Sequence, residues 1–232
     1  MATISWTALA WCLLPIALVC LIHWQWQGRP QEVLMASSRM VLQLLGVGYV
    51  LIFLFDNPSP WTSLLVISVM ISAASWIAVR PVRDQPGFLG PAILALGVSV
   101  SLHLLISLTL VMKVEQWYTP SVIIPLAGMY FANTMNAISL SAERYHSERQ
   151  RNQSPDQARL TAFNAAMIPQ INGLLAVGLV ALPGMMTGQI LSGVSPLIAV
   201  RYQIMIMAML LGCSGLGSAI LLHQLTRIRS QQ

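Results

Sequence analysis

The amino-acid sequence predicts an all-α polytopic membrane protein with about seven transmembrane helices, its N-terminus outside and its C-terminus in the cytoplasm. Composition, the length of the apolar segments and the distribution of arginine support this fold class. Of the 232 residues, 56% are hydrophobic and only 8% are charged, whereas a soluble domain has about 25% charged residues. We therefore expect a single transmembrane domain over residues 1–232.

Seven apolar segments are long enough to cross the hydrocarbon core of a bilayer, which takes about 20 residues of helix. They cover approximately residues 5–26, 36–55, 61–79, 88–112, 121–145, 167–187 and 197–223. Trp24 and Trp26 end the first segment as an interfacial anchor. This segment has no basic start and exceeds signal-peptide length, so we expect it to span the membrane.

Basic residues are concentrated on alternate connections between the segments. Ten of the 12 basic residues follow this pattern: Arg29, Arg39, Arg80, Arg83, Arg144, Arg149, Arg151, Arg159, Arg227 and Arg229. The positive-inside rule assigns these connections to the cytoplasm, while Lys113 and Arg201 fall on the opposite side. No run of consecutive basic residues occurs, so we expect membrane lipid rather than nucleic acid as the neighbour of these charges.

The fifth segment carries a polar face inside the membrane. Met129, Asn133, Asn136, Leu140 and Glu143 follow one another at intervals of three or four residues, which places them on one side of a helix. An unpaired amide in hydrocarbon costs several kcal/mol, so this face should meet protein or a polar cavity. It is either a helix–helix contact or the wall of a translocation path.

The connection 142–166 is the only sizeable cytoplasmic one, and it contains a helix start. Ser154 is the expected N-cap, with Pro155 in the first turn and Gln157 completing a capping box. The helix carries an apolar stripe and lies near three arginines, so we expect it to dock an ATPase. The arginines are Arg149, Arg151 and Arg159, and the stripe is Leu160, Phe163 and Met167. The alternative is that the helix lies in the membrane interface. We expect Pro169 to interrupt it.

Residues 183–189 (PGMMTGQ) join the last two segments and predict a broken helix or a re-entrant turn. Such backbone is tolerated at membrane depth only where protein covers it or where it lines a cavity. Met185, Met186 and Gln189 are therefore assigned to the path with Met129, Asn133 and Asn136, and Arg201 lies nearby in sequence. Thioether sulfur is a soft ligand, which would favour a soft or borderline metal.

Several kinds of chemistry are missing. No GxxxxGK[ST] motif occurs, so we expect no ATPase in this chain. The histidines do not show the spacing of a zinc site. His103 lies among Ser99, Ser101 and Ser107, which leaves a membrane-embedded hydrolase as an alternative function. A histidine bonded to a neighbouring helix is the simpler interpretation.

Three motifs resemble the FetB-like family of ABC transporter permeases. The first is SRMVLQLL at residues 38–45, and the second combines Gly128, Met129, Asn133 and Asn136 with residues 143–145 (ERY). The third and longest runs from IPQIN at 168–172 through LPGMMTGQI at 182–190 to RYQ at 201–203. The resemblance covers nearly the whole chain.

The resemblance implies a multi-pass inner-membrane permease that exports a metal ion, iron in this family, as a homodimer with a separate ATP-binding subunit. No cofactor is then expected in this chain, and ATP would bind the partner. The sequence departs from the family pattern in its cytoplasmic connection, because only about twenty residues separate Tyr145 from Ile168 and an L-x-L-G-A segment is absent. This departure leaves open a third alternative, a membrane scaffold that does not transport.

Overall fold

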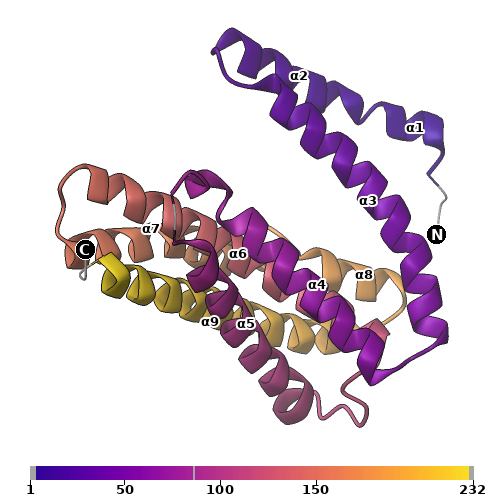
Figure 1. Ribbon diagram of the computed structural model, residues 1–232. Helices are drawn as coiled ribbons and strands as arrows, with labels where there is room; N and C mark the ends of the chain where they lie inside the picture. The colour runs from indigo at the N-terminus through magenta and orange to yellow at the C-terminus, as the bar shows by residue number, and fades with distance from the viewer. Residues whose placement is uncertain (1–3, 86, 230–232) are drawn as a thin grey trace. The chain divides into compact units, whose positions relative to one another are not determined.

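The computed structural model describes residues 4–85 and 87–229, and these form helices joined by turns, with no β-sheet among them. The chain divides into two compact units, Met1–Asn57 and Pro58–Gln232. Figure 1 shows the helices of both units. The predicted all-α class is confirmed.

The first unit is a helical hairpin. Its helices are α1 (Trp6–Ala10), α2 (Leu13–Gln25) and α3 (Pro30–Asp56), and α2 packs against α3. Ser5 caps α1, its hydroxyl accepting a hydrogen bond from the backbone N–H of Ala8. Pro30 begins α3 at the first helical position, where its missing N–H costs nothing.

The second unit is a bundle whose central helix is α6. Its elements are α4 (Pro60–Ala78), a 3₁₀ turn (Arg80–Val82), α5 (Leu89–Leu105) with a π-helical extension (Ile106–Val111), α6 (Pro120–Gln150), α7 (Pro155–Ala176), α8 (Gly184–Leu191) and α9 (Pro196–Arg229). Helices α4, α5, α7 and α9 all pack on α6, and α8 packs on α9.

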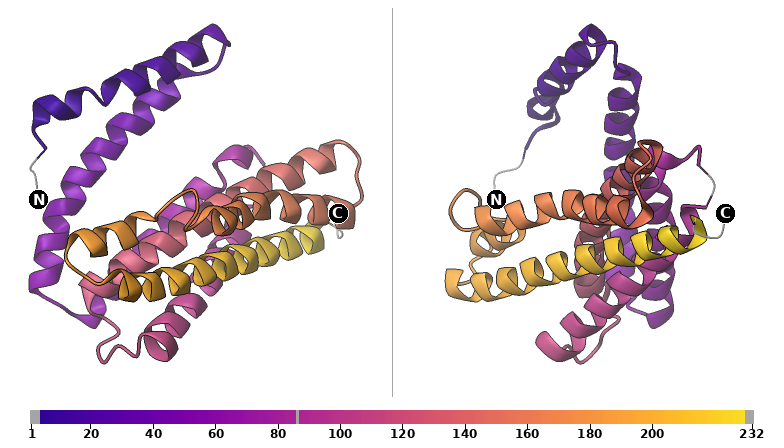
Figure 2. Two further views of the ribbon diagram at one scale, coloured as in Figure 1. Left: turned by 180° about the vertical axis from the view of Figure 1, so that it is seen from behind. Right: turned by 90° about the vertical axis from the view of Figure 1, so that its left-hand side faces the viewer.

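The path of α7 differs from the prediction. Pro169 lies inside α7 and does not end it; the helix continues to Ala176. In Figures 1 and 2 the α6–α7 connection and the end of α9 lie at one end of the bundle, and α8 lies at the other. Helix α7 therefore runs the length of the bundle between α6 and α9, the two helices on which it packs.

Six helical segments of the described chain are long and apolar enough to cross a membrane. They are Trp6–Gln25, Pro30–Asp56, Pro60–Ala78, Leu89–Val111, Pro120–Gln150 and Pro196–Arg227. The remaining predicted segment, 167–187, is divided between the end of α7, a turn and the start of α8. The turn contains Gly178 at φ +83°, a left-handed conformation that favours glycine. The broken backbone expected in this region is present.

Small residues let the helices of the bundle approach closely. Ala158, Ala162 and Ala166 recur every fourth residue on α7 and are fully buried, as is typical of helix interfaces in membranes. One very close approach is at Gly217 of α9, where a β-carbon would lie 2.6 Å from Thr134 Cγ2 on α6 and 3.1 Å from Ser99 Oγ on α5. Gly217 is thus the point at which three helices meet.

This contact predicts opposite effects of one substitution at two glycines. Gly217→Ala should lower the free energy of unfolding by about 1–3 kcal/mol, because the methyl group overlaps a stiff threonine side chain. Gly97→Ala on α5 is the matched control, since its β-carbon would meet nothing within 4 Å, and alanine is the better helix former. Thermal unfolding in detergent measures both. Equal stability of the two variants would contradict the close packing.

Candidate functional site

The two ends of the second unit are each held by a contact between helices, and only one of them is rich in arginine. At one end, the Ser63 hydroxyl at the start of α4 donates a 2.7 Å hydrogen bond to the carbonyl of Tyr118, just before α6. At the other end, the rings of Phe88 and His146 lie edge to face at 6.4 Å, which joins the start of α5 to the end of α6. This second end, the arginine-rich end, carries Arg80, Arg83, Arg144, Arg149, Arg151, Arg159 and Arg227.

Acidic partners hold several of these arginines. Buried Glu148 forms ion pairs with Arg144 at 2.8 Å and with Arg151 at 3.7 Å. Arg159 pairs with Asp156 at 3.0 Å, and Arg149 donates to the backbone carbonyl of Gln153. The arginines predicted to dock an ATPase thus also fix the turn between α6 and α7. Glu148, the acidic residue at the centre of this arrangement, is not among the site residues predicted from the sequence.

A groove opens between the first half of α7 and the last part of α9 at the arginine-rich end. Its volume is about 820 Å³. It is lined by Asp156, Arg159, Leu160, Phe163, Ala219, Ile220, Leu222, His223 and Gln224. The structure therefore brings together Arg159, Leu160 and Phe163, three of the predicted docking residues, and adds a wall from α9 that the sequence did not indicate.

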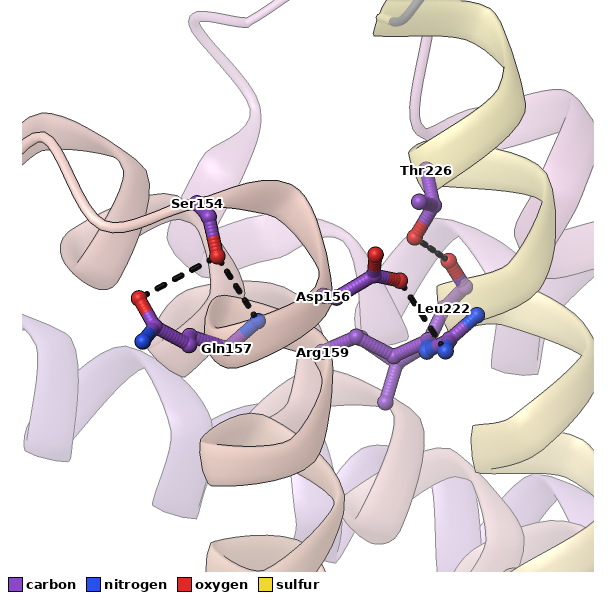
Figure 3. A network of polar contacts seen from close by, with 6 residues as sticks. All are labelled: Ser154, Asp156, Gln157, Arg159, Leu222 and Thr226. Carbon is purple, nitrogen blue, oxygen red and sulfur yellow. Dashed lines mark hydrogen bonds and ion pairs between the residues drawn. The ribbon is translucent and has the colours of Figure 1, made fainter.

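The helix start beside this groove is confirmed with one change. The Ser154 hydroxyl accepts a hydrogen bond from the backbone N–H of Gln157 at 3.3 Å. It donates a second bond to Gln157 Oε1 at 3.1 Å (Figure 3). The two side chains thus bond to each other, whereas a capping box would direct Gln157 to the backbone N–H of Ser154. Asp156 lies in this same first turn and Arg159 follows it, and both side chains lie beside α9 near Leu222 and Thr226 (Figure 3).

The predicted amide face of α6 is the open face of the second unit. Asn136, Leu140 and Glu143 are exposed, and Met129 and Asn133 are half-buried. Asn133 Nδ2 donates a 2.9 Å hydrogen bond to the carbonyl of Met129. One N–H group of this amide is therefore satisfied within the helix. Within this unit, the neighbouring helices cover the other side of α6.

The remaining predicted path residues lie around α8. A cavity of about 510 Å³ between α7, α8 and α9 is lined by Met186, Met207 and Gln203, together with apolar side chains. Gln203 is 6% exposed, and its Oε1 has no hydrogen-bond partner in the part of the chain that the structure describes. Met185 and Arg201 are exposed, and Gln189 is half-buried. This cavity includes none of the α6 amides, so a single chain does not bring the two halves of the predicted path together.

The interior of the bundle holds a different set of polar groups, which we call the polar seam. Its members come from α5, α6 and α9, and each has 0% exposure: Ser99, Ser107, Tyr130, Thr134, Ser141, Tyr145, Cys213, Ser214 and Ser218. Thr134 Oγ1 donates a hydrogen bond to Cys213 Sγ at 3.0 Å, and the hydroxyls of Ser107 and Tyr130 lie 2.7 Å apart. The seam contains hydroxyl and thiol groups and no charged side chain.

The hydrogen bonds at one end of the seam have a defined direction. The Ser107 hydroxyl donates its one hydrogen to the carbonyl of His103 at 2.7 Å. The Tyr130 hydroxyl must therefore be the donor in its bond with Ser107. The His103 ring contacts the carbonyl of Ser99 through Nδ1 at 2.7 Å, and its Nε2 lies against Gly212 of α9. Among the described residues no serine hydroxyl bonds to this ring, so the arrangement lacks the nucleophile–base contact of a hydrolase.

The polar seam has a signal in the sequence of α6. Tyr130, Thr134, Ser141 and Tyr145 are spaced by four, seven and four residues, which places them on one face of α6. Their hydroxyls bond easily to a helix backbone and occur in many apolar helices. The amides of the two asparagines on the opposite face cost more free energy in lipid than hydroxyls do, and the predicted path was therefore assigned to that face.

Span-length apolar helices, an arginine-rich end and an uncharged polar interior define a multi-pass membrane protein. The chain belongs to the Uncharacterised protein family (UPF0014), whose model matches residues 6–161 and 149–228. The two matched stretches overlap at residues 149–161, around the α6–α7 connection, which is shorter here than the family pattern expected from the sequence. The resemblance to FetB-like permeases is confirmed.

Three relatives illustrate the similarity. A UPF0014 membrane protein of Synechocystis is 38% identical over 90% of this chain and 87% of its own. The probable iron export permease protein FetB of Escherichia coli is 31% identical over 92% of this chain and 86% of its own. The UPF0014 membrane protein STAR2 of Oryza sativa is 32% identical over 87% of this chain and 75% of its own. No solved structure matches.

The bond between α5 and α6 predicts a measurable coupling. Ser107→Ala and Tyr130→Phe each remove one hydroxyl, and the double variant removes both. We expect a coupling energy of about 0.6–1.7 kcal/mol in a double-mutant cycle, the range found for hydrogen bonds between membrane helices. Unfolding in detergent measures it, with Thr109→Ala as the control because this exposed hydroxyl bonds only to its own helix. A coupling of zero would contradict the bond.

Proposed function

We propose that this protein is the transmembrane permease subunit of an ABC transporter that moves a metal ion, specifically iron, out of the cytoplasm. The observation that carries the proposal is the similarity, over nearly the full length of both chains, to a relative named as a probable iron export permease. A separate ATP-binding subunit supplies the ATP and its hydrolysis. The metal ion is the substrate of the transporter, and the inner membrane is its location.

The topology of the proposal has seven passages, with the N-terminus outside and the C-terminus in the cytoplasm. Six passages are the span-length helices, and α7 supplies the other because it runs between the two ends of the bundle. The gathering of arginines at one end supports the orientation, since the positive-inside rule assigns that end to the cytoplasm. The α8 end is then outside.

The docking surface for the ATP-binding subunit is the groove between α7 and α9. It lies at the arginine-rich end, and exposed Leu160 and half-buried Phe163 give it apolar contact area. The arginines that surround it, Arg149, Arg151 and Arg159, add a positive rim. Apolar anchors inside a polar rim are characteristic of protein interfaces.

Two copies of the chain pair through the amide face of α6 in this proposal. The exposed amide of Asn136 would be costly against lipid, and a second copy offers an identical amide as its partner. Met129 and Asn133 would then become buried as well. Met185, Met186, Gln189 and Arg201 remain the predicted outer part of the path, around α8.

The orientation can be tested with two single cysteines at opposite ends of the second unit. In a background without the native cysteines, Glu115→Cys should react with a membrane-impermeant maleimide added to intact cells, whereas Gln153→Cys should react only after lysis. Both positions are exposed in the structure. The reverse labelling pattern would overturn the orientation and move the groove away from the cytoplasm.

The function can be tested with a charge placed in the groove. Inverted membrane vesicles that contain the wild-type chain and its ATP-binding partner should accumulate Fe(II) when ATP is added. Phe163→Asp should reduce co-purification of the partner and iron accumulation at least fivefold, because it places a carboxylate among apolar side chains.

Asn164→Asp is the matched control for this test. It adds the same charge one residue further along α7, at an exposed position that is not part of the groove lining, and should leave both readouts unchanged. Normal partner binding by Phe163→Asp would remove the groove from the proposal. Absence of ATP-dependent iron accumulation by the wild-type chain would contradict the proposed substrate.

A further inference from the structure

We propose that the polar seam is the route by which the metal ion crosses the protein, and that the structure shows this route closed at Gly217. The inference rests on the proposed function and names the groups that line the route. It replaces the amide face of α6, the route predicted from the sequence, with the opposite face of the same helix.

The seam extends through most of the thickness of the hydrocarbon core of a bilayer. From Tyr130 to Tyr145 it follows α6 for 15 residues, which is about 22 Å at a rise of 1.5 Å per residue. The hydrocarbon core of a bilayer is about 30 Å thick. Hydroxyl and thiol groups of α5 and α9 accompany α6 along this length, with Ser107 opposite Tyr130 and Cys213 opposite Thr134.

Several seam hydroxyls lack partners in the closed state. A serine in a membrane helix usually bonds to the carbonyl one turn before it, and Ser99 and Ser107 do so. The hydroxyls of Ser141, Tyr145, Ser214 and Ser218 are buried and have no hydrogen-bond partner among the described residues. A buried polar group without a partner requires an explanation. Water or an ion that enters the seam would satisfy all four, whereas a seam used only to join helices would gain nothing from them.

The chemistry of the seam suits a cation in passage. Hydroxyl oxygens are ligands for hard and borderline cations, and the Cys213 thiol adds a softer donor for a borderline ion such as Fe(II). The seam contains no carboxylate that would hold the ion tightly. A site that binds weakly at several successive points allows an ion both to enter and to leave.

Helix α9 approaches α5 and α6 closely at Gly217, within the seam. A β-carbon at Gly217 would lie 2.6 Å from Thr134 Cγ2, 3.1 Å from Ser99 Oγ and 3.4 Å from Ile138 Cδ1. The space beside Gly217 thus has no room for a methyl group unless these side chains move, and so none for a hydrated ion. Opening the route therefore requires α9 to move away from α5 and α6, which would bring water to Cys213 and Ser218 on the same helix.

Native Cys213 makes this opening measurable. A thiol reacts with methanethiosulfonate reagents as the thiolate, which forms in water and not in a dry core. Three chains with a single cysteine each are compared in a Cys12→Ser, Cys20→Ser background. The first retains Cys213, and the other two combine Cys213→Ala with Ser218→Cys in the seam or with Ala162→Cys on α7. Ala162 is equally buried but lies outside the seam.

Inverted vesicles that contain each chain and its ATP-binding partner are treated with a small cationic methanethiosulfonate, with and without ATP and Fe(II). Modification is followed by intact mass, and iron accumulation is measured in the same vesicles. We expect ATP and Fe(II) together to raise the rate of modification at least tenfold at Cys213 and at Ser218→Cys, with no change at Ala162→Cys.

The outcomes separate this inference from the proposed function. If iron accumulates while both seam cysteines stay unmodified, the route lies elsewhere and the transport function stands. If both seam cysteines react on addition of ATP but no iron accumulates, the seam opens and the assigned substrate is wrong. Equal acceleration at all three positions would mean that the helices separate throughout the bundle, which overturns the seam as a defined route.

Discussion

The close contact between α6 and α9 at Gly217 is the constraint on which the second unit depends. Hydrocarbon supplies no hydrogen bonds, so the polar side chains of a membrane bundle must bond to neighbouring helices or to their own backbone. With no side chain at Gly217, α9 comes close enough for Thr134 to reach Cys213 and for Ser99 to lie at the same level. The same approach places Gly212 against the His103 ring. Tight packing and burial of the polar seam are therefore a single feature of the structure.

Much of the fold could be predicted from the sequence because it depends on local rules. Apolar length located six helices that could span a membrane, and a serine–proline pair located the start of α7. The continuation of α7 through Pro169 could not be predicted in this way. A proline removes one backbone hydrogen bond and usually ends or bends a helix, but α7 packs on both α6 and α9, and its buried residues extend up to Met167, two positions before the proline. Tertiary contact thus outweighed a local preference.

The candidate site shows the same distinction between local and tertiary information. Asn133 and Asn136 could be recognised because an amide in an apolar segment is costly wherever it points. The hydroxyls of Thr134 and Ser141 could not, because a hydroxyl in a helix can bond to its own backbone and then carries no information about neighbours. Their significance depends on α5 and α9 presenting hydroxyl and thiol groups at the same levels. Thr134 and Cys213 are about 80 residues apart in the sequence, and only the packed structure shows that they are in contact.

The groove and the polar seam share one helix, which suggests how ATP hydrolysis would be coupled to transport in the proposed function. Helix α9 carries Cys213, Gly217 and Ser218 in the seam, and it also forms one wall of the groove at Ala219, Ile220 and His223. The two sets of residues follow each other directly along fewer than three turns of helix. A partner that binds the groove and shifts α9 relative to α7 therefore acts on the helix that closes the seam. No long-range pathway is required, because a rigid helix transmits the displacement directly.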